Sequence, residues 1–244
     1  MAIAYIKTAV GTNKKIDEDT VVAGKSIICN SSFTASVVEG PIAIADGVGG
    51  NAAGDIASYE VCECLSECKK VTFQHFQSIN KILLDMSKSN PEYRNMATTL
   101  SGIFINTDSP VITMFHVGNT RIYALQANRY LKQLTDDDTT VNFLVKTGRL
   151  TEEEAEHYSG RNEITACFGG GKEQLLQMRI EDIPVDTYSM LLMTSDGIHD
   201  TLSIDEMEDA IEEGGDWMSA VCMLIDKAKA KGSTDDCTAI IVEL

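Results

Sequence analysis

The sequence predicts an α+β fold, built as a four-layer α-β-β-α sandwich in which helix pairs flank two antiparallel sheets. Two observations predict this class. Helical periodicity occurs in pairs of neighbouring segments, and elsewhere the period is that of strands that follow one another directly. Such grouping favours separate helix and sheet layers over alternating βαβ units. We find no linker, low-complexity tract or repeat, so residues 1–244 are expected to form a single domain.

The first helix pair is expected in the segments 55–68 and 76–86. The first of these helices begins near Asp55, and its apolar face is formed by Ala57, Val61, Cys64, Leu65 and Cys68. The second has apolar residues at helical spacing and ends before Pro91. This spacing puts Cys64 and Cys68 on the buried face and Cys62 off it. We therefore interpret the cysteines as core residues rather than metal ligands, and the four histidines, which lack metal-ligand spacing, as core or surface residues.

Strand-like runs follow at 97–105, 111–117 and 120–126, and the tight Gly118-Asn119 turn between the last two predicts an antiparallel meander. Further strands are expected near 175–181, 188–194 and 238–243. A capping box of Ser203 with Glu206 predicts a helix to about residue 213, and helical spacing over 217–231 predicts its partner. The same box occurs at 151–154.

Composition limits the partners of the chain. The formal charge is −17, with 37 acidic residues against 20 Lys and Arg, so we expect no binding to nucleic acid or to a membrane surface. No apolar stretch is long enough for a membrane span, and the N-terminus lacks the features of a signal peptide. Seven cysteines without scaffold spacing suit a reducing compartment. We expect a cytoplasmic monomer.

Three aspartates stand where apolar runs meet polar turns. Asp46 follows the run at 41–45, Asp196 follows LLMTS, and Asp235 stands just before TAIIVEL. Each Asp-Gly turn alone would be an ordinary tight turn. Buried carboxylates without a partner are costly, however, and carboxylate oxygens are the ligands of hard divalent cations. The three together predict a shared cation site.

Around these residues the chain resembles the metal-dependent Ser/Thr protein phosphatases of the type 2C (PPM) family, in their bacterial stand-alone form. The resemblance runs nearly from end to end, and its strings occur in the order of the family's motifs: IDEDT, IADGVGGNAAGDIAS, ATTLSGIFI, VGNTRIYAL, LTDDDTTVNFLVKTGRLTEEEA, NEITACFGG, SDGIHDTL and STDDCTAIIVEL. The resemblance implies the same sandwich, with a flap-like segment around residues 136–165.

The resemblance also implies two Mn²⁺ or Mg²⁺ ions in a cleft at one end of the sheets. Asp46, Asp196 and Asp235 would be the catalytic ligands, with Asp46 bridging both ions and the Gly47 carbonyl bound to one. A metal-bound water with a lowered pKa would attack phosphorus directly, without a phosphoenzyme.

Accessory positions carry further expectations. Glu18 and Asp19 would hold metal-bound waters. Lys14 stands where the family usually has a phosphate-gripping arginine, and the alternatives are a solvated lysine or a role for Lys15 instead. Asn119 stands where many relatives have an aspartate that helps to bind a third metal. A neutral amide is a poor ligand for a hard cation, so we expect at most a weak third site.

Two functions from different classes remain open. The first is a phosphatase that acts on phosphoserine and phosphothreonine in phosphoprotein substrates, opposed by a Ser/Thr kinase. The second is a catalytically weak regulator that uses the phosphatase fold to bind a phosphoprotein or a kinase, which the substitutions at Lys14, Asn119, Ala166 and Asp236 would suit. A nucleotide cyclase or another two-aspartate metal enzyme would not explain the full series of strings.

Overall fold

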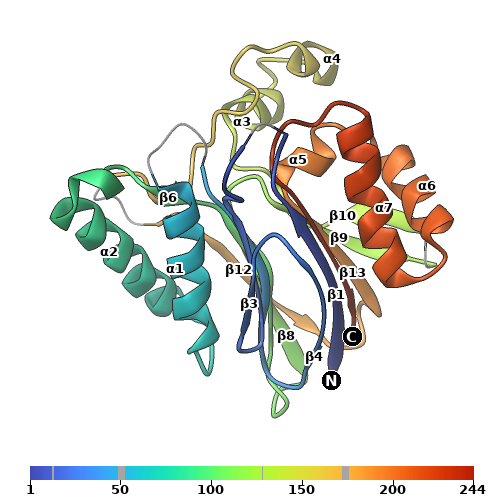
Figure 1. The fold of residues 1–244 in the computed structure, drawn as a ribbon, viewed down its shortest axis with the longest axis horizontal. Coiled ribbons are helices and arrows are strands. Elements are labelled where there is room, and N and C mark those ends of the chain that lie inside the picture. The colour runs from blue at the N-terminus through green and yellow to red at the C-terminus, as the bar shows by residue number, and fades with distance from the viewer. Residues whose placement is uncertain (13, 49–52, 128, 172–175) are drawn as a thin grey trace.

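Two antiparallel sheets form the centre of the molecule, and the computed structural model describes all residues except 13, 49–52, 128 and 172–175 (Figure 1). The first sheet has the order β10 (Tyr130–Gln133), β9 (Arg121–Gln126), β13 (Met190–Thr194), β14 (Cys237–Glu243), β1 (Ala2–Ala9) and β4 (Ser32–Val37). The second has the order β12 (Arg179–Pro184), β8 (Val111–Val117), β7 (Leu100–Ile105), β5 (Gly40–Asp46), β2 (Asp19–Ala23) and β3 (Ser26–Ile28). The α+β class predicted from the sequence is confirmed.

Helices cover the outer faces of both sheets. Figure 1 shows α1 (Gly54–Ser66) and α2 (Phe73–Ser89) on one side, and α6 (Ile204–Gly214) and α7 (Trp217–Ala230) on the other. The short elements are α5 (Asp196–His199), the 3₁₀ turn η1 (Pro91–Tyr93) and the paired strands β6 (Ala97–Thr98) and β11 (Phe168–Gly169). Both predicted capping boxes are confirmed. Ser203 is the N-cap of α6 and Thr151 is the N-cap of α4 (Glu152–Glu156), each with reciprocal hydrogen bonds to the N3 glutamate.

Three apolar clusters hold these parts together. Between the sheets, alternate residues of the strands pack on one another, and Ile6 of β1 lies opposite Ile240 of β14. The other face of β14 points to α6 and α7, so Ile241 is buried in a second cluster with Leu224. A third cluster joins α1 and α2 to the outer face of the second sheet. Because β14 is buried on both faces, its sequence is a continuous apolar run rather than an alternating one.

The meander predicted over 97–126 is wrong in its last strand. β7 and β8 pair as expected, but β9 leaves that sheet and pairs with β13 and β10 in the other one. The crossing occurs at Gly118, whose φ of +104° is open to glycine but strained for other residues. The strand expected near 175–181 also differs, since β12 begins at Arg179 and residues 172–175 lie outside the described ones.

The predicted apolar face of α1 is rotated from the observed one. Cys62 is fully buried and its Sγ donates to the Thr20 carbonyl at 3.5 Å, whereas Cys64 and Cys68 are only partly buried. The helix ends at Ser66, so Cys68 lies beyond it and its spacing was misleading. Cys62 belongs to the apolar cluster around α1 and α2, and Cys64 and Cys68 pack against that cluster, as expected of core cysteines.

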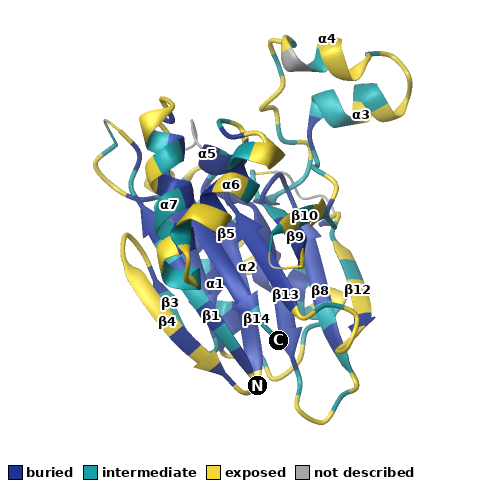
Figure 2. Cartoon of the chain, turned by 90° about the vertical axis from the view of Figure 1, so that its right-hand side faces the viewer, coloured by how far each residue is buried: buried dark blue, intermediate teal, exposed yellow. Residues whose placement is uncertain are grey.

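The segment 136–165 lies beyond one end of the sheets. It contains α3 (Thr140–Lys146) and α4, and Figure 2 shows both standing apart from the sheets with mostly exposed or half-buried surfaces. We call residues 136–165 the flap. Among the described helices, none has both the length and the apolar character required to cross a membrane.

Candidate metal centre and adjoining cavity

Strand ends from both sheets bring the predicted aspartates together. Asp46 ends β5 and lies opposite Asp19, the first residue of β2. Asp196 lies two residues after the end of β13 and opens α5, and Asp235 lies two residues before the start of β14. These strands belong to different sheets whose ends meet at the same side of the molecule, so residues far apart in the sequence share one site.

The pKa values of the carboxyl groups report this proximity. The pKa of Asp46 is raised well above its usual value by burial and then by the charges of Asp196, Asp19 and Asp235. Burial, with the charges of Asp235 and Asp200, raises the pKa of Asp196 to about 7. Both shifts have the same origin, since carboxylates removed from water repel one another. The cluster therefore favours the binding of positive charge.

Asp19 supplies a second sign of a missing partner. Its Oδ2 accepts hydrogen bonds of 2.7 Å from Ser195 Oγ and from Thr238 Oγ1. Its Oδ1 is buried and has no hydrogen-bond partner among the described residues, and the pKa of the group is raised by burial and then by Asp17. An unsatisfied buried carboxylate oxygen is costly, and a cation with its waters would satisfy it.

Gly47 lies where its backbone approaches α1 closely. Its N–H donates to the Glu18 carbonyl at 3.0 Å, and a Cβ at this position would lie 2.6 Å from the carbonyl carbon of Gly54. Any larger residue would displace the start of α1. Gly49 and Gly50, which complete the Gly-rich turn, lie outside the described residues.

Lys14 lies among carboxylates. Its ammonium contacts Glu18 Oε2 at 3.1 Å, Asp236 Oδ2 at 3.0 Å and Asp235 Oδ1. Burial acts to lower the pKa of Lys14, but hydrogen bonds to Asp235 and Asp236 outweigh it and raise that pKa. The expected competitor Lys15 is exposed. The side chain predicted to bind phosphate is thus the counter-ion of a predicted metal ligand in this structure.

Asp236 anchors the loop that carries Lys14, a role that the sequence did not reveal. Its carboxylate is almost fully buried and accepts from Gly11 N at 2.7 Å and from Glu18 N at 2.9 Å. The Asp-Asp pair before β14 gives no clue to these contacts, because the donors come from the opposite end of the chain.

The donor set suits hard divalent cations. Every predicted ligand offers oxygen, and the carboxylates are crowded beyond what Lys14 can neutralise. In the described part of the chain, no three Asp, Glu, His or Cys side chains are already arranged to enclose a metal ion. The fit to cations therefore rests on the chemistry and crowding of the oxygens.

Asn119 orients one of the carboxylates. It is 5% exposed, and its Nδ2 donates to Asp196 Oδ2 at 2.9 Å. Its Oδ1 has no partner among the residues that the structure describes. The side chain therefore acts on Asp196 through a hydrogen bond, whatever its value as a metal ligand.

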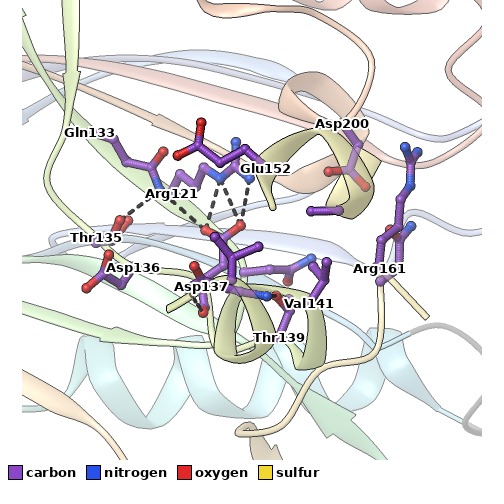
Figure 3. A pocket seen from close by; sticks show the side chains of 15 residues that line it. Arg121, Gln133, Thr135, Asp136, Asp137, Thr139, Val141, Glu152, Arg161 and Asp200 are labelled. Carbon is purple, nitrogen blue, oxygen red and sulfur yellow. Dashed lines mark hydrogen bonds and ion pairs between the residues drawn. The ribbon is translucent and has the colours of Figure 1, made fainter. Parts of the chain in front are cut away.

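A cavity of about 520 Å³ adjoins this centre, a size typical of ligand sites (Figure 3). One wall is the flap, with Thr139 and Val141, and the other is the edge of the first sheet, with Gln133. Arg161 and Asp200 line both this cavity and a smaller hollow of about 180 Å³ that contains Asp196 and Asp235. The two spaces are therefore neighbours.

The sequence did not point to the groups that build this cavity. Arg121 forms a two-point ion pair with Asp137, with Nη2 to Oδ2 at 2.6 Å and Nε to Oδ1 at 2.9 Å, and Figure 3 shows this pair at the centre of the lining. Arg121 belongs to the VGNTRIYAL string and Asp137 to the run of three aspartates at 136–138, but neither string indicated that the two residues pair. Read along the sequence, the run of aspartates resembles an ordinary solvated acidic turn.

Comparisons with known proteins give a consistent result. Residues 27–231 match the family model of protein phosphatase 2C. The serine/threonine phosphatase stp of Listeria welshimeri is 30% identical over 215 residues, which is 83% of each chain. The protein phosphatase PhpP of Streptococcus pneumoniae is 29% identical over 214 residues, covering 83% of this chain and 85% of the relative.

Solved structures with the same fold include phosphatases. The serine/threonine phosphatase PstP/Ppp of Mycobacterium tuberculosis superposes with a TM-score of 0.80 at 25% identity, over 100% of this chain and 99% of the other. The catalytic domain of PstP in complex with two manganese ions gives a TM-score of 0.75 at 24% identity, over 100% and 99% of the two chains.

Proposed function

The chain belongs to the protein phosphatase 2C family, and from this premise we propose that it hydrolyses phosphoserine and phosphothreonine in proteins with two Mn²⁺ or Mg²⁺ ions. The observation that supports this most strongly is the crowding of Asp46, Asp196 and Asp235: burial and the charges of neighbouring carboxylates, Asp235 among them, raise the pKa values of Asp46 and Asp196. A module that only binds phosphoproteins would gain nothing from this crowding.

The proposed roles are those that the resemblance to the family implies for these residues. Asp46 would hold both ions, the Gly47 carbonyl one of them, and Asp196 and Asp235 the other. When bound, the ions neutralise the phosphoryl charge and lower the pKa of a water molecule that supplies the nucleophile. Asn119 holds the Asp196 carboxylate in place through its 2.9 Å hydrogen bond.

The accessory residues act outside these ligands. Asp19, with one oxygen fixed by Ser195 and Thr238, would present the other to ion-bound water, and Glu18 would do the same. Lys14, which lies beside Asp235 and Asp236, would bind the substrate phosphate. We propose no third ion, because Asn119 offers only an amide oxygen.

The cellular setting is also part of the proposal. The relatives are protein phosphatases, so the substrates would be phosphoproteins and the opposing enzyme a Ser/Thr kinase. The charge of −17 supports a protein partner over nucleic acid or an anionic membrane surface. We infer that the enzyme acts as a cytoplasmic monomer.

The test is the release of phosphate from a phosphothreonine peptide with and without Mn²⁺, together with calorimetric titration of Mn²⁺. We expect Mn²⁺-dependent hydrolysis and about two ions per chain. Asp235→Asn should lower kcat/KM by about 100-fold or more, because it removes a charged ligand of an ion that would stabilise the negative charge of the transition state. The control is Lys25→Met, which breaks only an exposed ion pair with Glu67. An inactive wild-type protein that binds no Mn²⁺ would exclude the proposal.

A further inference from the structure

We propose that Asp138 is a positioning residue that ties both ends of the flap to the turn of Asn119 and thereby holds the Asp196 carboxylate in its working orientation. The inference deepens the proposed function, because Asp196 matters only if the site is catalytic. The hydrogen bonds that support it are properties of the chain itself.

Asp138 and Gly118 are joined by a reciprocal pair of hydrogen bonds. The Asp138 N–H donates to the Gly118 carbonyl at 2.7 Å, and the Gly118 N–H donates to Asp138 Oδ2 at 2.9 Å. Because each of the two residues donates one bond and accepts the other, the pair fixes both the distance between the flap and the turn and their relative orientation. The Asp138 side chain is 17% exposed, so little water competes for its oxygens.

The same residue joins the two ends of the flap. Its carbonyl accepts from the Thr165 N–H at 2.7 Å, which brings the last residue of the flap beside the third. Its Oδ1 accepts from Arg179 Nη2 at 2.9 Å, which attaches this junction to β12. Asp138 is therefore the point where the flap, the second sheet and the Gly118 turn meet.

The Gly118-Asn119 turn connects Asp138 to the predicted metal ligands. Asn119 follows Gly118 directly and donates to Asp196 Oδ2. Gly118 packs closely against Thr99, since a Cβ at Gly118 would lie 2.5 Å from Thr99 Cγ2, and its φ of +104° suits only glycine. Thr99 in turn accepts from the Asp46 N–H at 3.1 Å. A shift of Gly118 would therefore displace groups that contact two predicted metal ligands.

The cavity wall depends on the same junction. Thr139, Val141 and Asn142 follow Asp138 and line the cavity of Figure 3 beside the smaller hollow of Asp196. The orientation of Asp138 therefore affects the position of this wall of the cavity. We expect substrates that contact the flap to respond to this residue more than small phosphate esters do.

The flap root, residues 136–138, has a second attachment at His116, whose Nε2 also lies 4.0 Å from Asp138 Oδ2. His116 Nε2 lies 2.9 Å from the Asp136 carbonyl oxygen, and His116 Nδ1 lies 2.7 Å from Ser101 Oγ. Variants at Asp138 should therefore keep the flap attached and folded while they loosen its orientation. This separates positioning from simple folding.

The experiment compares Asp138→Ala and Asp138→Asn by hydrogen exchange of the metal-free protein and by steady-state kinetics with Mn²⁺. In Asp138→Ala, exchange at the Gly118 amide should quicken by about fivefold or more, since the bond to Oδ2 is lost, while α7 amides keep their rates. We expect kcat to fall about tenfold for p-nitrophenyl phosphate, and kcat/KM to fall further for a phosphopeptide. Asp138→Asn keeps an oxygen that can accept from the Gly118 N–H. In this variant the Gly118 exchange rate and the kinetic constants should therefore return most of the way to the wild-type values.

The control is Lys146→Met, which breaks an exposed ion pair at the neighbouring Asp136 and should change neither measurement. Unchanged Gly118 exchange or unchanged kcat in Asp138→Ala would overturn the inference. Asp138→Asn behaving like Asp138→Ala would also overturn it, since the ion pair with Arg179 would then be the essential contact. If the wild-type protein were inactive, the proposed function would fail, whereas the exchange measurement would still decide the structural coupling.

Discussion

The chain contains two groups of aspartates with opposite electrostatic character. At the metal centre, the carboxylates of Asp46, Asp196 and Asp235 lie close together. Lys14 is a cation beside them and forms an ion pair with Asp235. At the flap root, each of the aspartates 136–138 has a cation of its own, from Lys146, Arg121 and Arg179 in turn. The pKa is raised for Asp46 and Asp196, whereas a hydrogen bond to Lys146 lowers that of Asp136.

This difference separates carboxylates that hold parts of the fold together from carboxylates that lie close together with too few cations. A paired carboxylate holds two segments together, and its charge is already compensated. Carboxylates that share too few cations repel one another and destabilise the folded chain, and the binding of a metal ion would offset this repulsion. Substitutions in the two groups should therefore differ in their effects on activity and on stability.

Asp46→Asn should have the largest effect, with opposite signs for activity and stability. Loss of the residue that would contact both ions should lower kcat for a phosphopeptide by about 10³-fold or more, equivalent to about 4 kcal/mol. Without metal, removal of one mutually repelling carboxylate should raise the unfolding temperature by about 2–4 °C, or about 1 kcal/mol. Mn²⁺-dependent kinetics and metal-free thermal unfolding measure the two effects. An active or less stable variant would contradict the assignment of Asp46.

Asp137→Ala should destabilise the chain by about 3 kcal/mol. The guanidinium of Arg121, which is partly buried, would lose the carboxylate that accepts two of its hydrogen bonds. Urea unfolding measures the change. The matched variant Arg121→Ala, combined with Asp137→Ala, should recover part of the loss, since neither charge then remains unpaired. Strictly additive losses in the double variant would contradict the proposed pairing.

The two groups differ in how far sequence could predict them. Asp46 and Asp196 end apolar runs, so their place at strand ends followed from local patterns, and the motif order led to the family. The helix pairs followed from periodicity and from capping boxes such as Ser203 with Glu206, which act within one turn.

Partners from distant segments could not be predicted in the same way. The contact between Lys14 and Asp236 joins opposite ends of the chain, and the crossing of β9 to the other sheet depends on which strand edge is available after Gly118. The face of α1 was misjudged because Cys68 lies past the end of the helix. Each failure concerns tertiary packing, which local spacing does not encode.

Lys14→Met tests the cation within the crowded group. In the metal-free protein it should cost about 1–2 kcal/mol, because Asp236 is buried and loses a charged donor. With saturating Mn²⁺ the loss should shrink, and KM for a phosphopeptide should rise severalfold if Lys14 then binds phosphate. Unfolding with and without Mn²⁺, together with kinetics, separates the two roles. An unchanged KM would leave Lys14 as a counter-ion only.

His116 adds a pH dependence at the flap root. Burial and then Arg179 lower its pKa below the ordinary value, although Asp138, the Asp136 carbonyl and Asp137 act in the opposite direction. Below about pH 6.5 the unfolded chain takes up a proton that the folded chain resists, so this contribution to stability is complete above pH 6.5 and is lost as the pH falls. Urea unfolding of the wild type and of His116→Gln between pH 7.5 and 5.5 should show their difference shrinking. A constant difference would contradict a neutral buried His116.

Lys146→Met should have the smallest effect, less than about 0.5 kcal/mol. Its ammonium lies 2.6 Å from Asp136 Oδ2, but both side chains are more than half exposed, so water replaces the lost partner at little cost. Urea unfolding in low and high salt measures the difference, which should vanish at high salt. A loss near that of Asp137→Ala would mean that short distance, rather than burial, sets the strength of these pairs, and the contrast between the two groups of aspartates would then need a different explanation.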